Sequence, residues 1–208
     1  MIAIVDYGVG NLFSLNCSLR AIGAEAVVTS DPKVLESADK LLLPGVGAFG
    51  DAADKLRSSS LGDVVVREAK KGKPLLGICL GMQLLFEKSY EYGEHDGLAL
   101  IPGEVRPISE VVPGTYKIPH IGWNALHFPK QSPLFMQVEE GECVYFVHSF
   151  AAFHCEDAVV ATTEYGAPLT AAVQYQNIFG CQFHPEKSGK TGLAILKAFA
   201  EYQGEFSC

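Results

Sequence analysis

The first half of the chain alternates short apolar runs with segments of helical periodicity. Buried strands are predicted where the apolar runs are too short for helices, at residues 2–5, 26–29, 41–43 and 74–78. Helices are predicted at 12–22, 62–71 and 81–87. Asn11 is suited to cap the first helix and Gly23 to end it. Strands that alternate with helices across short loops indicate a parallel sheet covered by helices on both faces.

The second half has a different pattern. Strand-like runs at 144–147, 158–163, 170–174 and 178–183 are separated by turn residues rather than by helices. Residues 102–126 carry several Gly and Pro and are predicted to form short strands and loops. A last helix is predicted at 191–202, and the tail 204–208 is predicted to fray. We find no repeat or linker, so we predict one α/β domain over residues 1–208, an open, mostly parallel twisted sheet with a small antiparallel strand region.

Composition and charge exclude several classes of protein. The 208 residues are 48% hydrophobic, enough for one sizeable core. A net charge of −8 argues against nucleic-acid binding, and the basic run Lys70, Lys71 and Lys73 is interpreted as a solvated helix end. The pattern predicts neither a signal peptide nor a membrane span. The six cysteines lack CxxC spacing, which favours free thiols in a reducing cytoplasm over a zinc site.

The strongest chemical signal is Gly77-Ile78-Cys79-Leu80-Gly81, where an apolar run meets a Gly-x-Cys-x-Gly turn before a helical pattern. This is the pattern of a nucleophile elbow with cysteine in place of serine. Side chains at 77 and 81 would clash in so sharp a turn, and Cys79 would be strained. The helix start would favour the thiolate, and the Leu80 N–H would stabilise an oxyanion. A small buried cysteine at a tight turn is the alternative.

A second signal is the sequence Phe183-His184-Pro185-Glu186, which follows a predicted strand. In an extended chain, residues two apart point to the same side, and Pro185 biases His184 away from helical dihedrals. Glu186 can therefore orient the imidazole while His184 faces the sulfur of Cys79, as in a nucleophile–base–acid triad. His184 alone also fits a surface histidine. Its combination with the elbow cysteine favours catalysis.

A third turn, Pro44-Gly45-Val46-Gly47, follows the strand predicted at 41–43. It lies at the sheet edge where ligands bind in doubly wound folds. Its glycines permit close approach to a substrate and reorientation of a peptide, although an ordinary strand-to-helix turn has the same pattern. The glycines of residues 6–11 do not match GxGxxG spacing, so no dinucleotide site is predicted.

Together these motifs resemble the class I (triad) glutamine amidotransferases, which have a flavodoxin-like fold. The resemblance rests on residues 77–83 and on His184-Pro185-Glu186. Five further segments resemble one branch of this family, the glutaminase subunits of a two-subunit synthase in histidine biosynthesis. These segments are 6–11, 44–49, 119–124, 145–150 and 182–188, so the resemblance covers essentially the whole chain.

The resemblance implies a role for each matching residue. Cys79 would be the nucleophile, His184 the general base and acid, and Glu186 the residue that orients it. The oxyanion hole would be formed by Val46, Gly47 and Leu80. The substrate, L-glutamine, would be held by Gly45, Gln83, His148, Ser149 and Phe150. A partner subunit would contact Pro119, His120, Trp123, Asn124 and Lys187.

The resemblance also implies a reaction and a partner. Glutamine would be hydrolysed to glutamate and ammonia without a metal or organic cofactor. The ammonia would pass to a (β/α)8 cyclase subunit in a heterodimer, which incorporates it into the imidazole product and releases an aminoimidazole carboxamide ribonucleotide. Alternatives are the glutaminase of pyridoxal phosphate synthesis, a free-standing γ-glutamyl hydrolase, and a non-catalytic module that kept the fold. Trp123 fits either an interface anchor or a core residue.

Overall fold

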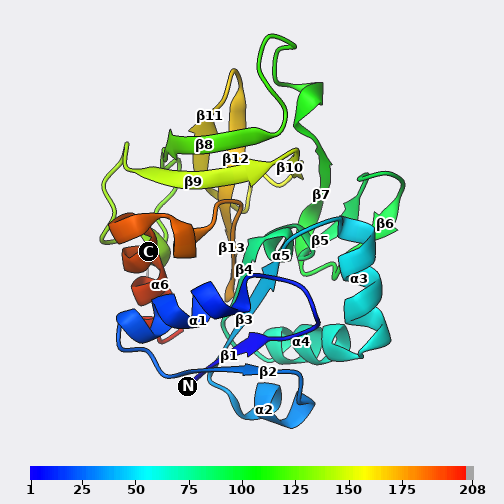
Figure 1. Cartoon of the computed structure of the whole chain (residues 1–208), viewed down its shortest axis with the longest axis vertical. Coiled ribbons are helices and arrows are strands. Elements are labelled where there is room, and N and C mark those ends of the chain that lie inside the picture. The colour runs from blue at the N-terminus through cyan, green and yellow to red at the C-terminus, as the bar shows by residue number, and fades with distance from the viewer. Residues whose placement is uncertain (205–208) are drawn as a thin grey trace.

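The computed structural model describes residues 1–204, and its centre is a seven-stranded sheet in the order β11-β12-β13-β4-β3-β1-β2 (Figure 1). The parallel part contains β1 (Ile2–Val5), β2 (Ala26–Thr29), β3 (Lys40–Gly45), β4 (Leu75–Cys79) and β13 (Ile178–Cys181). Antiparallel β12 (Pro168–Tyr175) and β11 (Val159–Glu164) extend one side. The predicted fold class is confirmed, whereas residues 205–208 of the tail predicted to fray lie outside the described residues.

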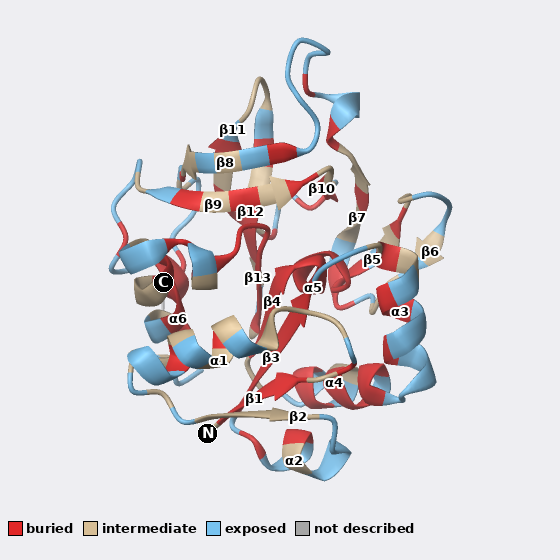
Figure 2. Cartoon of the chain, viewed as in Figure 1, coloured by how far each residue is buried: buried red, intermediate tan, exposed pale blue. Residues whose placement is uncertain are grey.

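Helices cover both faces of the sheet because successive strand residues, which point to opposite faces, are apolar. On one face, Leu42 and Leu76 share a core with α1 (Leu12–Ala21) and α6 (Gly189–Glu201). On the other face, Leu41, Leu43 and Leu75 share a core with α2 (Pro32–Ser37), α3 (Phe49–Ser58) and α4 (Leu61–Lys70). The central strands are buried throughout (Figure 2). Among the described residues, no helix has the length and apolar character needed to cross a membrane.

The ends of the first helix follow the sequence prediction. Asn11 accepts a hydrogen bond from the Ser14 N–H at 3.4 Å, and Gly23 ends the helix with φ +76°. The sequence patterns did not predict α2 and α3. Lys73 is not solvated as expected. Its ammonium donates to the carbonyls of Leu35 and Glu36 at the end of α2, at 2.8 and 2.7 Å.

Two smaller sheets lie beyond the carboxyl ends of the parallel strands. One contains β10 (Phe150–Phe153), β7 (Ile101–Pro107), β5 (Phe86–Ser89) and β6 (His95–Asp96). The other pairs β8 (His120–Ala125) with β9 (Cys143–His148). Single turns of 3₁₀ helix occupy Ile108–Glu110, Pro133–Phe135 and Pro185–Lys187. The β9–β10 connection, residues 148–150, lines the same cavity as Cys79 at the end of β4.

The helix predicted at 81–87 is wrong. Only α5 (Leu80–Gln83) forms, and Phe86 already pairs with Ile101 in the second sheet. The carbonyl of Leu84 accepts the N–H of Leu98 at 2.8 Å, and that of Leu85 accepts the N–H of Leu100 at 2.8 Å. These carbonyls therefore accept N–H groups of residues distant in sequence and not the N–H groups that would continue the helix. The helix dipole expected behind Cys79 is that of a single turn.

Candidate active site

The nucleophile elbow has the strained geometry that its sequence predicts. Cys79 joins β4 to α5 with φ +55° and ψ −114°, a conformation that costs a non-glycine residue roughly 1–3 kcal/mol. A Cβ at Gly77 would lie 2.7 Å from the Gly81 carbonyl oxygen, and one at Gly81 would lie 1.8 Å from the Leu43 oxygen. The predicted clash at both glycines is confirmed. The surrounding backbone therefore fixes the turn and leaves Cys79 only 8% exposed.

We expect Gly81→Ala to destabilise the protein by about 3 kcal/mol or more, since the new methyl group meets backbone that cannot move without displacing β3. Urea denaturation followed by circular dichroism measures the change. Gly114→Ala is the matched control, because nothing lies within 4 Å of the position a Cβ would take there. Equal stabilities for the two variants would show that the elbow tolerates a side chain.

The strand ladder brings the second motif to the elbow. β13 pairs in parallel with β4, with Cys181 opposite Ile78, so the chain that leaves β13 passes beside Cys79. The His184 Nδ1–H donates to Glu186 Oε1 at 2.9 Å, which leaves the other ring nitrogen for the sulfur. The His184 N–H donates to the Tyr145 carbonyl at 3.0 Å. The three residues of the expected triad are thus held together by elements on both sides.

The electrostatics favour a protonated His184. Burial alone would lower its pKa, but hydrogen bonds to Cys79 and Glu186 outweigh burial and raise the pKa to about 9. The His184 and Glu186 side chains are each 3% exposed, so solvent screens this pair weakly. Glu186 Oε2 is buried without a hydrogen-bond partner among the described residues. An imidazolium next to the sulfur is the arrangement that stabilises a thiolate.

A cavity of about 310 Å³ opens over Cys79 and His184, a size suited to a small polar molecule. The residues predicted to bind substrate or form the oxyanion hole that line it, besides this pair, are Val46, Gly47, Gln83, His148, Ser149 and Phe150. The turn 46–47 follows β3, where Gly47 has φ +96° and free space on its Cβ side. The cavity therefore joins the elbow, the glycine turn and the β9–β10 connection.

Three residues without a predicted role also line this cavity: Glu91, Tyr92 and Val147. Glu91 Oε2 accepts the Phe49 N–H at 2.6 Å, and burial raises the pKa of this carboxyl group. The only available signal was an acidic residue in the aromatic, glycine-ended turn Tyr90-Glu91-Tyr92-Gly93.

Two of the expected site residues lie away from the cavity or from the surface. Gly45 does not line the cavity, since β3 continues through it and pairs it with Cys79, and a Cβ there would lie 2.7 Å from the Gly81 nitrogen. His120 does not lie on the surface. It is fully buried, and its ring stacks on Tyr165 and Phe146 with centroids 4.0 and 4.9 Å apart.

The other residues expected at a partner surface are more accessible. Trp123 is 55% exposed, so it is not a core residue. Its ring packs edge-on against Tyr145, with centroids 6.0 Å apart, and the Lys187 ammonium lies 5.8 Å from the Tyr145 ring centre. Pro119 is exposed and also lines the cavity, whereas Asn124 is half-buried. Trp123, Tyr145 and Lys187 thus form an aromatic and cationic cluster at the surface.

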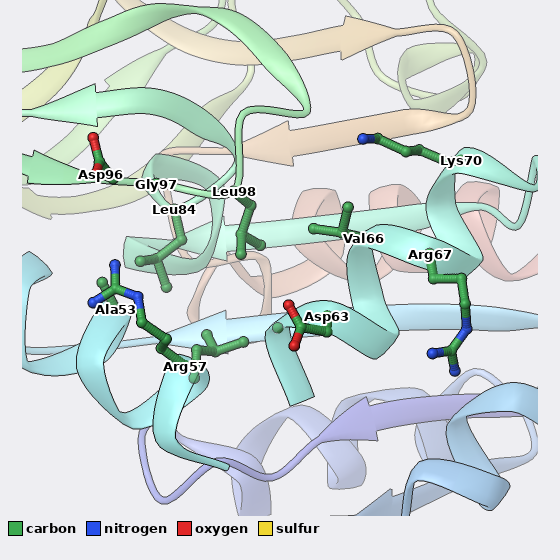
Figure 3. A pocket seen from close by; sticks show the side chains of 12 residues that line it. Ala53, Arg57, Asp63, Val66, Arg67, Lys70, Leu84, Asp96, Gly97 and Leu98 are labelled. Carbon is green, nitrogen blue, oxygen red and sulfur yellow. The ribbon is translucent and has the colours of Figure 1, made fainter. Parts of the chain in front are cut away.

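A larger cavity of about 570 Å³ lies elsewhere, between α3, α4 and residues 96–98 (Figure 3). Apolar Val66, Leu84 and Leu98 line it together with Arg57 and Asp63. Among the described residues, its lining includes no cysteine or histidine. Of these two cavities, only the smaller one brings a cysteine and a histidine together among the described residues.

Comparison with known proteins shows the family of the chain. Residues 3–201 match the family model for class I glutamine amidotransferases. The chain belongs to this family and is a glutamine-hydrolysing enzyme. Its relatives include imidazole glycerol phosphate synthase subunit HisH of Wolinella succinogenes, 50% identical over 97% of this chain and 99% of the relative. The subunit of the same name from Methanothermobacter thermautotrophicus is 51% identical, over 97% of this chain and 98% of the relative.

Solved structures share the fold at lower identity. A structure described as PurLQS from Thermotoga maritima superposes with a TM-score of 0.72 at 22% identity, covering 95% of this chain and 96% of that one. A structure described as a glutamine amidotransferase gives a TM-score of 0.74 at 18% identity, covering 96% and 99%. These similarities show that the chain shares the fold of these structures.

Proposed function

We propose that residues 1–208 form one domain, the glutaminase subunit of imidazole glycerol phosphate synthase, and that it hydrolyses L-glutamine with a Cys79–His184–Glu186 triad. The observation that carries the proposal is a strained, nearly buried cysteine beside a histidine whose Nδ1–H is held by a buried carboxylate, at the floor of one cavity. The names and high identity of the relatives support the choice of synthase.

The residues that line the cavity suggest how glutamine binds. The Glu91 carboxylate is suited to the α-ammonium group of glutamine, and residues 148–150 are suited to its amino-acid end. This arrangement directs the side-chain carboxamide toward Cys79. Holding the reacting carbon next to the sulfur converts the attack into an intramolecular step.

The Cys79 thiolate attacks the carboxamide carbon and forms a C–S bond. The N–H of Leu80 and an N–H of the Val46–Gly47 turn stabilise the oxyanion. His184 gives its proton to the departing nitrogen, so ammonia leaves and a glutamyl thioester remains. His184 then takes a proton from water, which attacks the thioester, and glutamate leaves with the thiolate restored. These steps use only groups of this chain, and we propose no cofactor.

The ammonia is proposed to pass to a (β/α)8 cyclase subunit, with which the chain forms a heterodimer in the cytoplasm. That subunit makes imidazole glycerol phosphate and an aminoimidazole carboxamide ribonucleotide. The surface of Trp123, Tyr145 and Lys187 supports this assignment, because exposed aromatic and cationic side chains are typical of interface anchors. Pro119 is exposed and also lines the cavity, so a partner that contacts Pro119 would affect the active site directly.

We expect the isolated chain to hydrolyse glutamine slowly and the complex with the cyclase and its nucleotide to be about 10²–10³-fold faster, the typical effect of one oxyanion donor. The Gly47 backbone has φ +96° and open space beside it, so the preceding peptide can turn an N–H into the hole when the partner binds. The measurement is steady-state glutamate release by the chain alone, with cyclase, and with cyclase plus a nucleotide analogue. Equal rates in all three would favour a free-standing hydrolase.

A further inference from the structure

A fully buried glutamine, Gln182, touches the sulfur that performs the proposed reaction. Its Nε2 lies 3.8 Å from Cys79 Sγ, and its side chain has no exposure to solvent. We propose that Gln182 is a catalytic residue of the glutaminase, one that donates an N–H to the Cys79 thiolate from an orientation fixed by the Phe150 carbonyl. This inference rests on the proposed function and adds a fourth group to the triad.

The direction of the amides follows from one atom that can only accept. Gln83 lies within 3.1 Å of the Phe150 carbonyl oxygen, so the Gln83 atom there must be Nε2, which donates. The same Nε2 lies 3.1 Å from Gln182, and its second hydrogen requires an acceptor, Oε1. The Gln182 Nε2 group therefore has to face the sulfur. A reversed Gln182 would set two NH₂ groups against each other.

The Phe150 carbonyl is itself held from its other side. It lies 2.8 Å from His148 Nδ1 and, because a carbonyl oxygen can only accept, this nitrogen carries the hydrogen that is donated. Burial lowers the pKa of His148 to about 4, so the neutral ring carries its one hydrogen at Nδ1. His148 thus fixes the carbonyl of residue 150, and that carbonyl fixes the orientation of both glutamines.

An N–H aimed at sulfur favours the thiolate, because hydrogen bonds to a charged acceptor are stronger than those to a neutral one. Protonated His184 supplies a positive charge beside the Cys79 sulfur. Gln182 supplies a neutral N–H donor, which does not titrate. The same hydrogen bonds limit how Gln83 can bind the substrate. Both of its amide hydrogens are used within the protein, which leaves only Oε1 for a substrate.

The test is Gln182→Met, which keeps the length of the side chain and removes the donor. We expect alkylation of Cys79 by iodoacetamide to be about tenfold slower near pH 7, with the whole rate–pH curve moved to higher pH. Mass spectrometry of the Cys79 peptide separates this reaction from that of exposed Cys17 and Cys143. In the complex with the cyclase, kcat for glutamine falls about tenfold while KM changes less than about twofold. Gln174→Met, on β12, is the control and keeps wild-type values.

A second variant covers the case in which methionine disturbs the core. Gln182→Glu keeps the acceptor for Gln83 and turns an oxygen toward the sulfur, so alkylation is expected to be slower than in Gln182→Met. Wild-type alkylation curves for folded Gln182→Met or Gln182→Glu would overturn the inference, whatever the effect on kcat. Because alkylation needs no glutamine, it reports on Gln182 even if the wild-type chain releases no glutamate. That last result would contradict the proposed function instead.

Discussion

Cys79→Ala is expected to lower glutamine-dependent synthesis by about 10⁴–10⁶-fold while leaving the fold and partner binding intact, since one member of a triad carries most of its effect. The thiolate is the only proposed nucleophile, and the substitution removes one atom without adding bulk at the strained turn. Ammonia is the proposed intermediate, so ammonium salt should restore product formation when the cyclase is present. The measurements are glutamate release and nucleotide product, each with glutamine or with ammonium.

Cys155→Ala is the matched control for this substitution. Cys155 is also buried, at 5% exposure, but it does not line the cavity of Cys79. This variant should retain the wild-type rate with glutamine. Glutamate release near the wild-type rate by Cys79→Ala would show that the triad assignment is wrong. Loss of the ammonium-dependent reaction as well would point to a damaged complex.

His184→Ala is expected to lower kcat for glutamine by about 10⁴–10⁶-fold, and Glu186→Gln is expected to be milder by at least about tenfold. Alanine removes the group that carries the proton. In the wild type, His184 Nδ1 lies 2.9 Å from Glu186 Oε1. Glutamine at position 186 keeps an oxygen that can accept this N–H and loses only the charge. Measurement of kcat for both variants tests the order, and a loss in Glu186→Gln as deep as in His184→Ala would give Glu186 another role.

The pH dependence of these variants follows from the raised pKa of His184. The imidazolium that protonates the leaving ammonia is lost as pH rises through about 9 in the wild type. The same interaction contributes folding stability that is fully present below the unfolded pKa of 6.5 and disappears as pH rises through the folded value. Glu186→Gln removes one cause of the raised pKa, so the basic limb of kcat should move to lower pH. A basic limb at the same pH in both enzymes would mean that the Glu186 charge does not stabilise the His184 imidazolium.

Features encoded locally could be predicted from the sequence. The strand at 2–5, the capped first helix and the glycines around Cys79 each depend on residues near one another in the chain, and each has the expected geometry. The helix at 81–87 failed because carbonyls of Leu84 and Leu85 bond to residues 98–101. Glu91 was missed for a related reason, since its place in the cavity depends on the same distant pairing.

Buried polar residues were the hardest to interpret from sequence. His120 stood in a motif suggestive of a partner surface, yet its ring is enclosed by Phe146, His148 and Tyr165. Gln182 lies in the segment 182–188, which carries part of the family resemblance, but the sequence predicted no role for it. Its contact with the sulfur depends on Gln83 and on a carbonyl at residue 150, and no pattern in one sequence indicates that three such distant positions meet.

The left-handed backbone at Cys79 sets a limit on engineering this enzyme. Glycine adopts φ +55° without strain, so the residue that favours the native turn most is one that has no sulfur. A population of variants screened only for heat resistance would therefore accumulate glycine at position 79 and become inert. Any selection for a more durable enzyme must include growth without histidine, or must hold that codon fixed.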